Sequence, residues 1–494
     1  MEVCPFQGIR YNQEVIGDLA AAICPPYDII TPEQQNFYYR TCDYNAIRLE
    51  LPSEQPGDNN TNNKYSRAAI TFKQWLKQGV LQIDDCPTFY LHDHYFEHLG
   101  KKKMRRGLIA RVKLEPWGTS IYPHEETFSK AKGDRLLLMR ACQANFSPLF
   151  SLYQDSERKM AQILSKASQG KPIMSFNLSP LTGKERDKGE KHIVWAISDS
   201  SLVRQISHFL AAQPLYIADG HHRYETALAY QQERAQGYSE PSPFIIASQS
   251  PERSDGAAKQ SLIGKEASNY IMMELVDFSD PGLLVLPIHR LVRGIAPSIL
   301  AELESQLGNF FSLDFVPLPK VLPCHPEPFA SCHSEGVLSV SEGIRPKNLA
   351  QDKLCEESRP FASLQGAVLG ILGLEPQSMV ALKQRRDVSI ETVMPCNRSQ
   401  AYKEFSVSLL NHIILDKVLS EAKDLDIAYT VELSEAYQQI KEGKYQLAFL
   451  LNPPQLEIVK AVVSAKDKLP RKSTYFYPKL PAGLIINPFL ACNV

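Results

Sequence analysis

The sequence predicts an α+β protein with mixed sheets and more than one domain. Segments in which apolar residues alternate like those of strands, such as 88–96 and 107–114, are interspersed with segments of helical spacing, such as 65–79. The chain has 494 residues. That is too long for one compact core, because single cores stop growing at roughly 250–300 residues. With 44% hydrophobic residues, most of the chain is expected to fold.

The charge balance and the cysteine pattern limit the classes of partner and compartment. The formal net charge is -1. Proteins that bind nucleic-acid backbone usually carry a basic excess, so we do not expect nucleic acid as a partner. The ten cysteines are scattered without a CxxC pair, which favours reduced thiols over a disulfide framework. No signal peptide or stretch of roughly 18 apolar residues is present, so we expect a soluble, cytoplasmic protein that does not bind membranes.

Turn residues and periodicity predict the elements of the first half of the chain. Pro25 and Pro26 give an extended segment followed by a turn, since each proline fixes φ and biases the preceding residue away from helix. The polar stretches include residues 123–133, a predicted loop, and 155–190, a predicted exposed helix followed by a hairpin or loop. Further strands are predicted at 150–153, 194–197 and 215–218, and helices at 134–140, 202–210 and 223–234.

The second half of the chain is predicted to contain a separate domain. Residues 270–276 and 283–292 are apolar, and we expect them to pair across the turn 279–282. The predicted domains are therefore 1–284 and 285–494, with a flexible insertion at about 317–362. The remaining predictions for this half are a helix at 405–419 and strands near Ile427 and Leu447. The tail at 472–479 either closes over a site or packs as a strand, and packing is favoured.

The first candidate site follows the apolar strand that ends at Ala218. A strand, a glycine-containing turn and a helix aim backbone N–H groups at an anion, and Gly220 permits the required turn. His221, His222 and Arg223 offer donors to phosphate oxygens. Asp219 could hold a divalent metal or orient a histidine. The alternative is that Asp219 caps the helix and the histidines are ordinary residues. Four polar groups at one junction favour the functional interpretation.

The second candidate site is the polar stretch before the predicted helix at 134–140. Glu125 or Glu126, if near a bound phosphate, could deprotonate a substrate hydroxyl. Lys130 and Arg135 could contact a nucleotide or a substrate carboxylate. The alternative is a solvated charged loop with Asp134 as the helix N-cap, and taken alone this alternative is favoured.

Two groups of possible zinc ligands carry a weaker signal. Cys324, His325, Cys332 and His333 lie within ten residues, but their spacing fits no standard zinc finger. The histidines at positions 92, 94 and 98 alternate along a predicted strand, and we do not favour zinc there either. The sequence has no P-loop, GxGxxG, GxSxG or HExxH motif, which excludes the commonest nucleotide-binding and hydrolase folds.

Over nearly its whole length the chain resembles a bacterial and archaeal family of unknown function, DUF1015. The stretches that carry this resemblance are Ile23–Asp28, Arg106–Ala110, Ala144–Pro148, Asp219–Arg223 and Lys472–Phe476.

Two motifs also resemble the sulfiredoxin/ParB-like superfamily, and within it the free serine kinases. These kinases pair a Pro-His-Glu-type segment, which carries a catalytic glutamate, with a downstream Asp-Gly-His-type turn. The corresponding segments here are Pro123–Glu126 and Asp219–Arg223. The resemblance implies a sulfiredoxin/ParB-like mixed-sheet core, followed by a C-terminal α/β domain. His221 stands where sulfiredoxin has its cysteine, so thiol chemistry is not expected there.

The resemblance implies phosphoryl transfer from ATP or ADP, with Mg²⁺, to a small hydroxyl metabolite such as free serine. The expected nucleotide- and phosphate-binding residues are Asp219, Gly220, His221, His222, Arg223, Lys130 and Arg135, with Asp219 also binding the metal. The expected catalytic residues are Glu125, Glu126 and His222. A nucleotide-binding switch or hydrolase, and a non-enzymatic interaction protein, are the alternatives. The sequence does not determine the oligomeric state.

Overall fold

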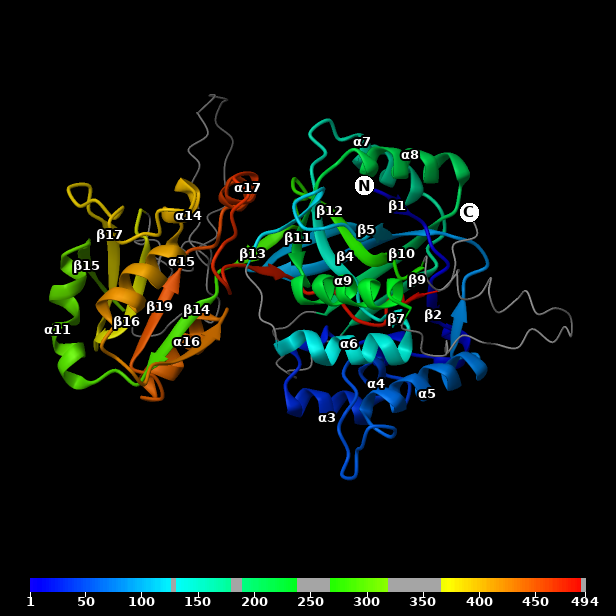
Figure 1. The fold of residues 1–494 in the computed structure, drawn as a ribbon, viewed down its shortest axis with the longest axis horizontal. Coiled ribbons are helices and arrows are strands. Elements are labelled where there is room, and N and C mark those ends of the chain that lie inside the picture. Colours follow the sequence, from blue (N-terminus) through cyan, green and yellow to red (C-terminus); the bar gives the residue numbers. More distant parts are fainter. Residues whose placement is uncertain (126–129, 179–188, 238–266, 319–365, 490–494) are drawn as a thin grey trace, which may run out of the picture. The chain divides into compact units, whose positions relative to one another are not determined.

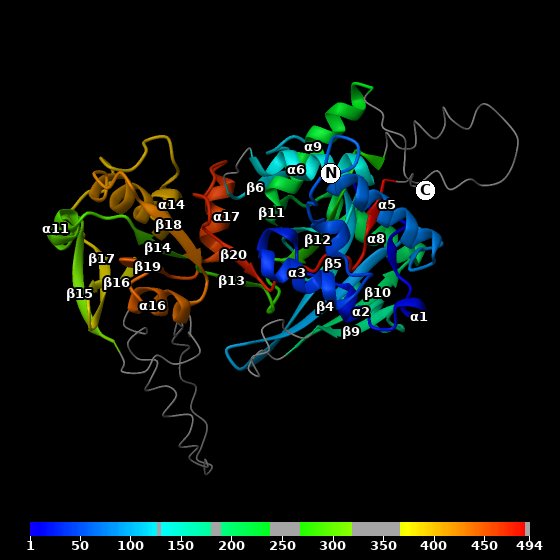
Figure 2. The ribbon, with the colours of Figure 1, turned by 90° about the horizontal axis from the view of Figure 1, so that it is seen from below.

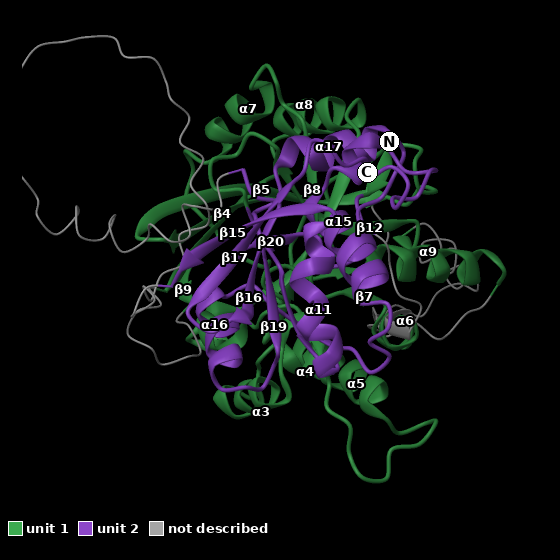
Figure 3. Ribbon diagram, turned by 90° about the vertical axis from the view of Figure 1, so that its left-hand side faces the viewer, with its two compact units in different colours: residues 1–123, 127–284, 478–494 green, residues 124–126, 285–477 purple. Residues whose placement is uncertain are grey.

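The chain divides into two compact units (Figure 1 and Figure 3). The computed structural model describes residues 1–125, 130–178, 189–237, 267–318 and 366–489. Unit 1 consists of residues 1–123, 127–284 and 478–494, and unit 2 consists of residues 124–126 and 285–477. The last segment, 478–494, therefore belongs to unit 1, although the sequence assigned it to the C-terminal domain. Of the predicted insertion, residues 319–362 lie outside the described residues.

Unit 1 is built on a nine-stranded mixed sheet. Its strand order is β6-β11-β8-β12-β5-β4-β10-β9, and β1 pairs with β5. The pairs β6–β11 and β8–β12 are parallel and the others are antiparallel, which confirms the predicted mixed α+β character. The strands are β1 (Val3–Cys4), β4 (Phe89–His98), β5 (Lys101–Lys113), β6 (Ile121–Pro123), β8 (Leu149–Tyr153), β9 (Met174–Leu178), β10 (Glu190–Ile197), β11 (Leu215–Asp219) and β12 (Tyr270–Asp277).

Helices lie on both faces of the large sheet (Figure 2), and unit 1 also contains two small sheets. The small sheets pair β2 (Ile9–Tyr11) with β3 (Leu81–Ile83), and β7 (Ala144–Asn145) with β21 (Asn487–Pro488). The helices are α1 (Gln13–Ile16), α2 (Leu19–Ala22), η1 (Tyr27–Ile29), α3 (Pro32–Thr41), α4 (Ile47–Glu50), α5 (Lys64–Lys77), α6 (Lys130–Cys142), α7 (Lys159–Ala167), α8 (Ser200–Ala211) and α9 (His221–Ala235).

Successive residues of the central strands point into two different cores. Leu91 and Leu108 belong to the core formed with α7, α8 and α9, while their neighbours Tyr90 and Ile109 belong to the core formed with α5 and α6. This is the alternation expected of a strand buried on both faces. The large sheet of unit 1 is therefore packed on both faces.

Two local predictions for unit 1 are wrong. Helix α6 begins at Lys130, four residues before the predicted start, so Asp134 lies within the helix and is not its N-cap. The predicted hairpin between 270–276 and 283–292 does not form, because β12 pairs with β5 and β8. Every residue of β12 from Ile271 to Val276 is buried, so pairing at the centre of the sheet outweighs the local turn signal.

Unit 2 contains a six-stranded sheet of order β15-β17-β16-β19-β14-β18. All of its described pairings are antiparallel, so the sequence prediction of an α/β arrangement for this part is wrong. The strands are β14 (His289–Arg293), β15 (Phe311–Pro317), β16 (Leu369–Glu375), β17 (Ser378–Gln384), β18 (Asp426–Thr430) and β19 (Leu447–Leu451). In addition, β13 (Leu284–Leu286) pairs with β20 (Tyr475–Tyr477), so the tail does form a strand.

The helices of unit 2 also lie on both faces of their sheet. One core includes residues of α11, the helical region at 406–418 and α17, and the other includes residues of α16. The helix predicted at 405–419 is formed by a short α-helix that continues as a π-helix. The helices are α11 (Pro297–Gly308), α14 (Gln400–Lys403), α15 (Ser406–Leu409), η2 (Leu410–Val418), α16 (Leu433–Lys441) and α17 (Leu456–Ser464). Among the described residues, no helix has both the length and the apolar character needed to cross a bilayer.

Candidate functional site

The predicted anion-binding turn lies between β11 and α9 in unit 1. Gly220 has φ +94°, a left-handed conformation that favours glycine. A Cβ at this position would lie 3.0 Å from Leu149 Cγ and 3.1 Å from Arg223 Nε. The N-cap residue of α9 is Gly220 itself, which has no side chain to cap the first turn. The 15-residue helix therefore presents its positive end at this turn.

Helix α9 is anchored by its buried face. The hydroxyl of Tyr224 donates to the carbonyl oxygen of Glu115 at 2.7 Å and accepts from the backbone N–H of the same residue at 3.0 Å. The Trp117 ring lies 4.3 Å from the Tyr224 ring and 6.5 Å from the His221 ring, measured between centroids. The backbone oxygen of His222 accepts from Thr226 within the helix at 2.8 Å. These contacts fix the orientation of the first turn.

The side chain of Arg223 is held by the Ala144–Pro148 stretch. Its Nη1 donates to the Ser147 hydroxyl at 2.9 Å and to the Pro148 carbonyl at 2.8 Å. Its Nη2 lies 3.7 Å from an oxygen of Asp219, and only 11% of the side chain is exposed. Two of the family-like stretches thus meet at one guanidinium, although more than seventy residues separate them.

Asp219 is paired with two cations. Its Oδ2 lies 3.2 Å from Lys479 Nζ as well as 3.7 Å from Arg223 Nη2. Burial acts to raise the pKa of Asp219, but Lys479 and Arg223 outweigh it and hold the pKa below its usual value. The carboxylate is therefore ionised, and its charge is compensated by neighbours that could also contact an anion.

Arg135 belongs to the same neighbourhood. Its Nη1 donates to the carbonyl oxygen of Glu50 at 2.6 Å, and its guanidinium lies 4.2 Å from the centre of the Tyr27 ring. The Glu50 carboxylate in turn accepts from Ser147, the residue that holds Arg223. Burial raises the pKa of Tyr27 to about 12, and Arg223 and Arg135 act in the opposite direction. We call Tyr27, Glu50, Arg135, Ser147, Asp219, Arg223 and Lys479 the Arg223 cluster.

Asp134 is an ion-pair partner beside this cluster. It pairs with Lys64 at 2.8 Å and with Arg135 at 2.5 Å, and it accepts from the Tyr65 hydroxyl at 2.8 Å. Burial opposes ionisation, but Arg135 and Lys64 hold the pKa of Asp134 at about 2. This carboxylate therefore links α5 to α6 and orients Arg135.

The candidate catalytic glutamates belong to a different unit from the turn. Glu125 is a residue of unit 2, and its Oε1 accepts from the backbone N–H groups of Ser473 at 3.2 Å and Thr474 at 2.9 Å, and from the Thr474 hydroxyl at 2.6 Å. His124 Nε2 also lies 2.6 Å from the Thr474 hydroxyl oxygen. Glu126 lies outside the described residues.

The remaining sequence candidates can be placed only in part. Lys130 begins α6, but its side chain lies outside the described part. The cysteine and histidine group at 324–333 also lies outside the described residues. Sequence reasoning did not assign Tyr27, Glu50, Ser147 or Lys479 to the site. The signal for Tyr27 and Ser147 was their place in the family-like stretches. Lys479 lies in the 472–479 tail, for which closing over a site was one of two interpretations, whereas Glu50 carried no signal.

The fold and the Arg223 cluster define a mixed α+β protein with charged side chains gathered at a strand–turn–helix junction. The chain belongs to the DUF1015 family, described as a protein of unknown function, whose model matches residues 3–367. The match ends before the Lys472–Phe476 stretch.

Solved structures similar to this chain include a conserved hypothetical protein from Pyrococcus furiosus. It has 12% sequence identity and a TM-score of 0.31, over 76% of this chain and 93% of that chain. They also include a free serine kinase in complex with AMP (11% identity, TM-score 0.33, 78% of this chain and 92% of that chain). A mutant of a free serine kinase in complex with ADP has 11% identity and a TM-score of 0.32, with the same shares of the two chains. No curated protein matches this chain in sequence.

Proposed function

We propose that this chain is a nucleotide-dependent kinase that transfers a phosphoryl group from ATP or ADP to a hydroxyl metabolite such as free serine. The phosphates bind at the first turn of α9, within an N-terminal core of the sulfiredoxin/ParB-like type. The observation that carries the proposal is the pairing of Arg223 and Lys479 with one carboxylate, Asp219, beside that turn.

The charges at the turn suit a phosphate group. Arg223 and Lys479 bring two cations within 4 Å of Asp219, and the N-terminus of α9 adds its partial positive charge. A guanidinium binds phosphate oxygens in a bidentate manner, whereas an ammonium acts as a point charge. Ser147 and Pro148 hold the guanidinium of Arg223 from behind, which lowers the entropy lost when an anion binds.

The acid–base role is assigned to the Pro123–Glu126 segment, as in the kinases that the two motifs resemble. Because Oε1 of Glu125 accepts three hydrogen bonds from residues 473 and 474, Glu125 suits a positioning role. We therefore assign the general base to Glu126, and the stabilisation of the transferred group to His222. Lys130 contacts the nucleotide, and Arg135 orients the cluster through Glu50.

Asp219 does not fit the role of a magnesium ligand in this arrangement. Its charge is already compensated by Lys479 and Arg223, whereas Mg²⁺ is usually bound through one or two carboxylates together with substrate phosphates. No step of the proposed reaction is therefore assigned to an ion on Asp219.

The test measures nucleotide binding by calorimetry and phosphoserine formation with the full chain. Arg223→Ala should lower turnover by about a hundredfold or more, as the loss of one electrostatic group in an active site does. Glu126→Ala should lower turnover while leaving nucleotide affinity near the wild-type value. Arg204→Ala, on the exposed face of α8, removes one arginine elsewhere in unit 1 and should leave both quantities unchanged.

Three outcomes would contradict the kinase assignment. If ATP and ADP do not bind with or without Mg²⁺, the chain is an interaction protein. If nucleotide is consumed equally fast without any acceptor, the chain is a nucleotide hydrolase. If Arg223→Ala retains wild-type turnover, the turn is not the phosphate site.

A further inference from the structure

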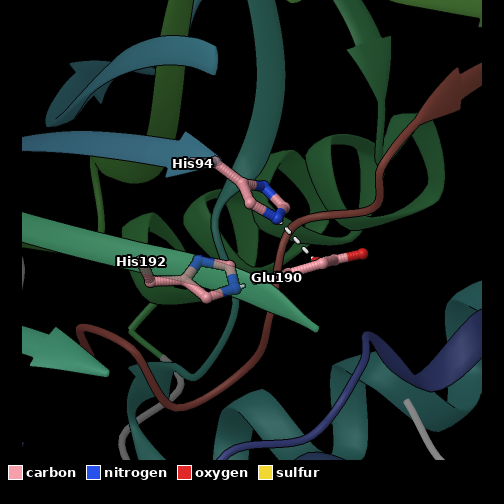
Figure 4. A group of neighbouring side chains, drawn as sticks. All are labelled: His94, Glu190 and His192. Atoms are coloured by element: carbon pink, nitrogen blue, oxygen red, sulfur yellow. Dashed lines mark hydrogen bonds and ion pairs between the residues drawn. The ribbon is translucent and has the colours of Figure 1, made fainter. Parts of the chain in front are cut away.

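A second cluster of ionisable side chains lies in unit 1, on the face of the sheet that carries Tyr90. His192 on β10 is directly opposite His94 on β4, which is opposite Arg105 on β5. Glu190 lies two residues before His192 and therefore on the same face of β10. The two histidines are fully buried, and 31% of the Glu190 side chain is exposed. Figure 4 shows the three side chains pointing toward one another.

We propose that His94, Glu190 and His192 bind a divalent transition-metal ion of the Zn²⁺ class. One ligand atom from each residue lies within 4.8 Å of the other two. Glu190 Oε2 is 2.6 Å from His94 Nε2 and 3.7 Å from His192 Nε2. Ligand atoms around a tetrahedral Zn²⁺ lie about 3.3–3.5 Å apart, since its bonds are about 2.0–2.2 Å long. The observed distances span this value, so small side-chain rotations suffice.

The decisive observation is the unused nitrogen of His192. Its Nε2 makes no hydrogen bond within the described part of the chain, although the ring is fully buried. A buried polar atom without a partner is uncommon and costs about 1–3 kcal/mol, so its presence requires an explanation. A metal ion bound at Nε2 supplies the missing partner.

The other nitrogen of His192 is engaged in a chain that sets its tautomer. His92 Nδ1 lies 3.1 Å from Glu274 Oε2, and His92 Nε2 lies 2.9 Å from His192 Nδ1. A carboxylate accepts, so the proton of His92 is on Nδ1 and its Nε2 accepts the Nδ1–H of His192. The Nε2 of His192 is then a lone pair directed at Glu190. Metal-bound histidines are oriented by outer-shell partners of this kind.

Gly107 makes room for this chain of contacts. It is the cross-strand partner of His92, and a Cβ at this position would lie 2.3 Å from Glu274 Oε1. Any side chain here would displace the carboxylate from His92. The glycine therefore has a steric role in the cluster, independent of backbone conformation.

Metal binding changes the contacts of Arg105. Its Nη2 donates to His94 Nδ1 at 3.3 Å, and its Nη1 donates to the carbonyl of Pro478 at 2.8 Å. Metal binding at His94 Nε2 moves the ring proton to Nδ1, so the contact of Arg105 with His94 is lost and its contact with Pro478 is kept.

The ligand types indicate which ion the cluster accepts. Two neutral imidazoles and one carboxylate match a three-ligand zinc site with an open fourth position. Mg²⁺ is not expected there, because it prefers oxygen ligands.

The test is titration of the EDTA-treated full chain with Zn²⁺ by calorimetry and with Co²⁺ by visible absorption. We expect one Co²⁺ per chain, with the bands of a four- or five-coordinate ion and without thiolate charge transfer. His192→Asn and Glu190→Gln should each weaken Zn²⁺ binding by more than about 100-fold, which exceeds the effect of losing an outer-shell partner. His208→Asn, on the exposed face of α8, is the matched control and should bind as the wild type.

A further variant tests the proposed chain of contacts. His92→Phe keeps a ring of similar size but removes both nitrogens, so affinity should fall by about 10–100-fold while a site remains. Circular dichroism and thermal melting establish whether each variant is folded. Glu190→Gln changes a partly exposed residue without changing its volume, so the test does not depend on the buried variants. The proposal is overturned if folded wild type binds no Zn²⁺, if thiolate bands appear, or if Glu190→Gln binds as the wild type.

Discussion

At the scale of single residues, the Arg223 cluster contains buried ion pairs whose cations, under the proposed function, also bind phosphate. Asp219 lies within 4 Å of two cations, and both cations are largely buried. If the ion pairs served stability alone, replacing all of the charged residues with uncharged ones would change the free energy of unfolding very little, as is often found for buried pairs. Binding and stability can therefore be separated by comparing single and double variants.

Lys479→Met should lower both the free energy of unfolding and the affinity for nucleotide. It removes the nearer of the two ion-pair partners of the largely buried Asp219, which should cost about 1–3 kcal/mol. The double variant Asp219→Asn with Lys479→Met removes both charges and should recover the stability but not the affinity. Thermal melting and calorimetry with ADP distinguish the two effects. Recovery of both quantities in the double variant would show that Lys479 acts only on Asp219.

Gly220→Ala should reduce both stability and nucleotide affinity. The left-handed φ of +94° costs about 1–2 kcal/mol for a residue with a Cβ, and that Cβ would press on Arg223 Nε at 3.1 Å. Gly237→Ala, at the other end of α9, has φ +90° and no atom of the described residues within 4 Å of the added Cβ. It should therefore lose similar stability without losing affinity. Equal affinities for the two variants would contradict the assignment of phosphates to the turn.

At the scale of elements, long-range pairing decides which strands become neighbours. The stretches 270–276 and 283–292 each form strands, yet they enter different sheets, because β12 is inserted between β5 and β8. Pairing between distant strands also fixes the surroundings of a buried histidine at the start of β14. His289 Nδ1 accepts from the backbone N–H of Leu451 on β19 at 3.1 Å.

The stability of unit 2 should depend on pH through His289. Burial and then Arg290 lower the pKa of His289 to about 3 from an ordinary value of 6.5, so the folded ring is neutral. Its contribution is complete above about pH 6.5. It is lost as the pH falls from there toward 3, at up to about 1.4 kcal/mol per pH unit.

The variant His289→Asn isolates this contribution. The amide oxygen of asparagine can accept from the Leu451 backbone N–H but does not titrate. The slope of the free energy of unfolding against pH should therefore decrease by the equivalent of up to one proton. Denaturant unfolding of the unit 2 transition between about pH 7 and pH 4 measures the slope. An unchanged slope would mean that another group controls the acid unfolding of this unit.

At the scale of the whole molecule, unit 1 is completed by the C-terminal segment of the chain. The buried apolar residues of this segment include four large ones in sequence positions 484–489: Leu484, Ile485, Ile486 and Phe489. Asn487 accepts from Arg111 at 2.6 Å, and β21 pairs with β7. Residues 1–284, apart from 124–126, thus form one folding unit with residues 478–494, and most of unit 2 lies between these two parts in the sequence.

Truncation after Tyr477 should therefore unfold unit 1 rather than unit 2. Loss of the four buried side chains removes about 6–12 kcal/mol at about 1.5–3 kcal/mol each. That is comparable to the entire stability of a typical domain, about 5–15 kcal/mol. Differential scanning calorimetry should show the unit 2 transition alone. Two transitions near the wild-type temperatures would contradict the division of the chain.

Local patterns in the sequence determined most of the elements and one part of the site. Periodicity gave the strands around β4, β5, β8 and β11 and the helices α5, α8 and α9, because a two- or 3.6-residue repeat depends only on neighbouring residues. The Asp219–Arg223 turn was likewise readable from its strand, glycine and helix.

Contacts between residues far apart in the chain were decided only by the tertiary structure. Lys479 joins Asp219 across 260 positions, and His192 faces His94 across 98 positions. The alternating histidines of β4 could be seen in the sequence, but the strand beside them could not. Strand order depends on which apolar faces are buried together. The apolar area that is buried in this way is a property of the folded chain and cannot be read from any short window of sequence.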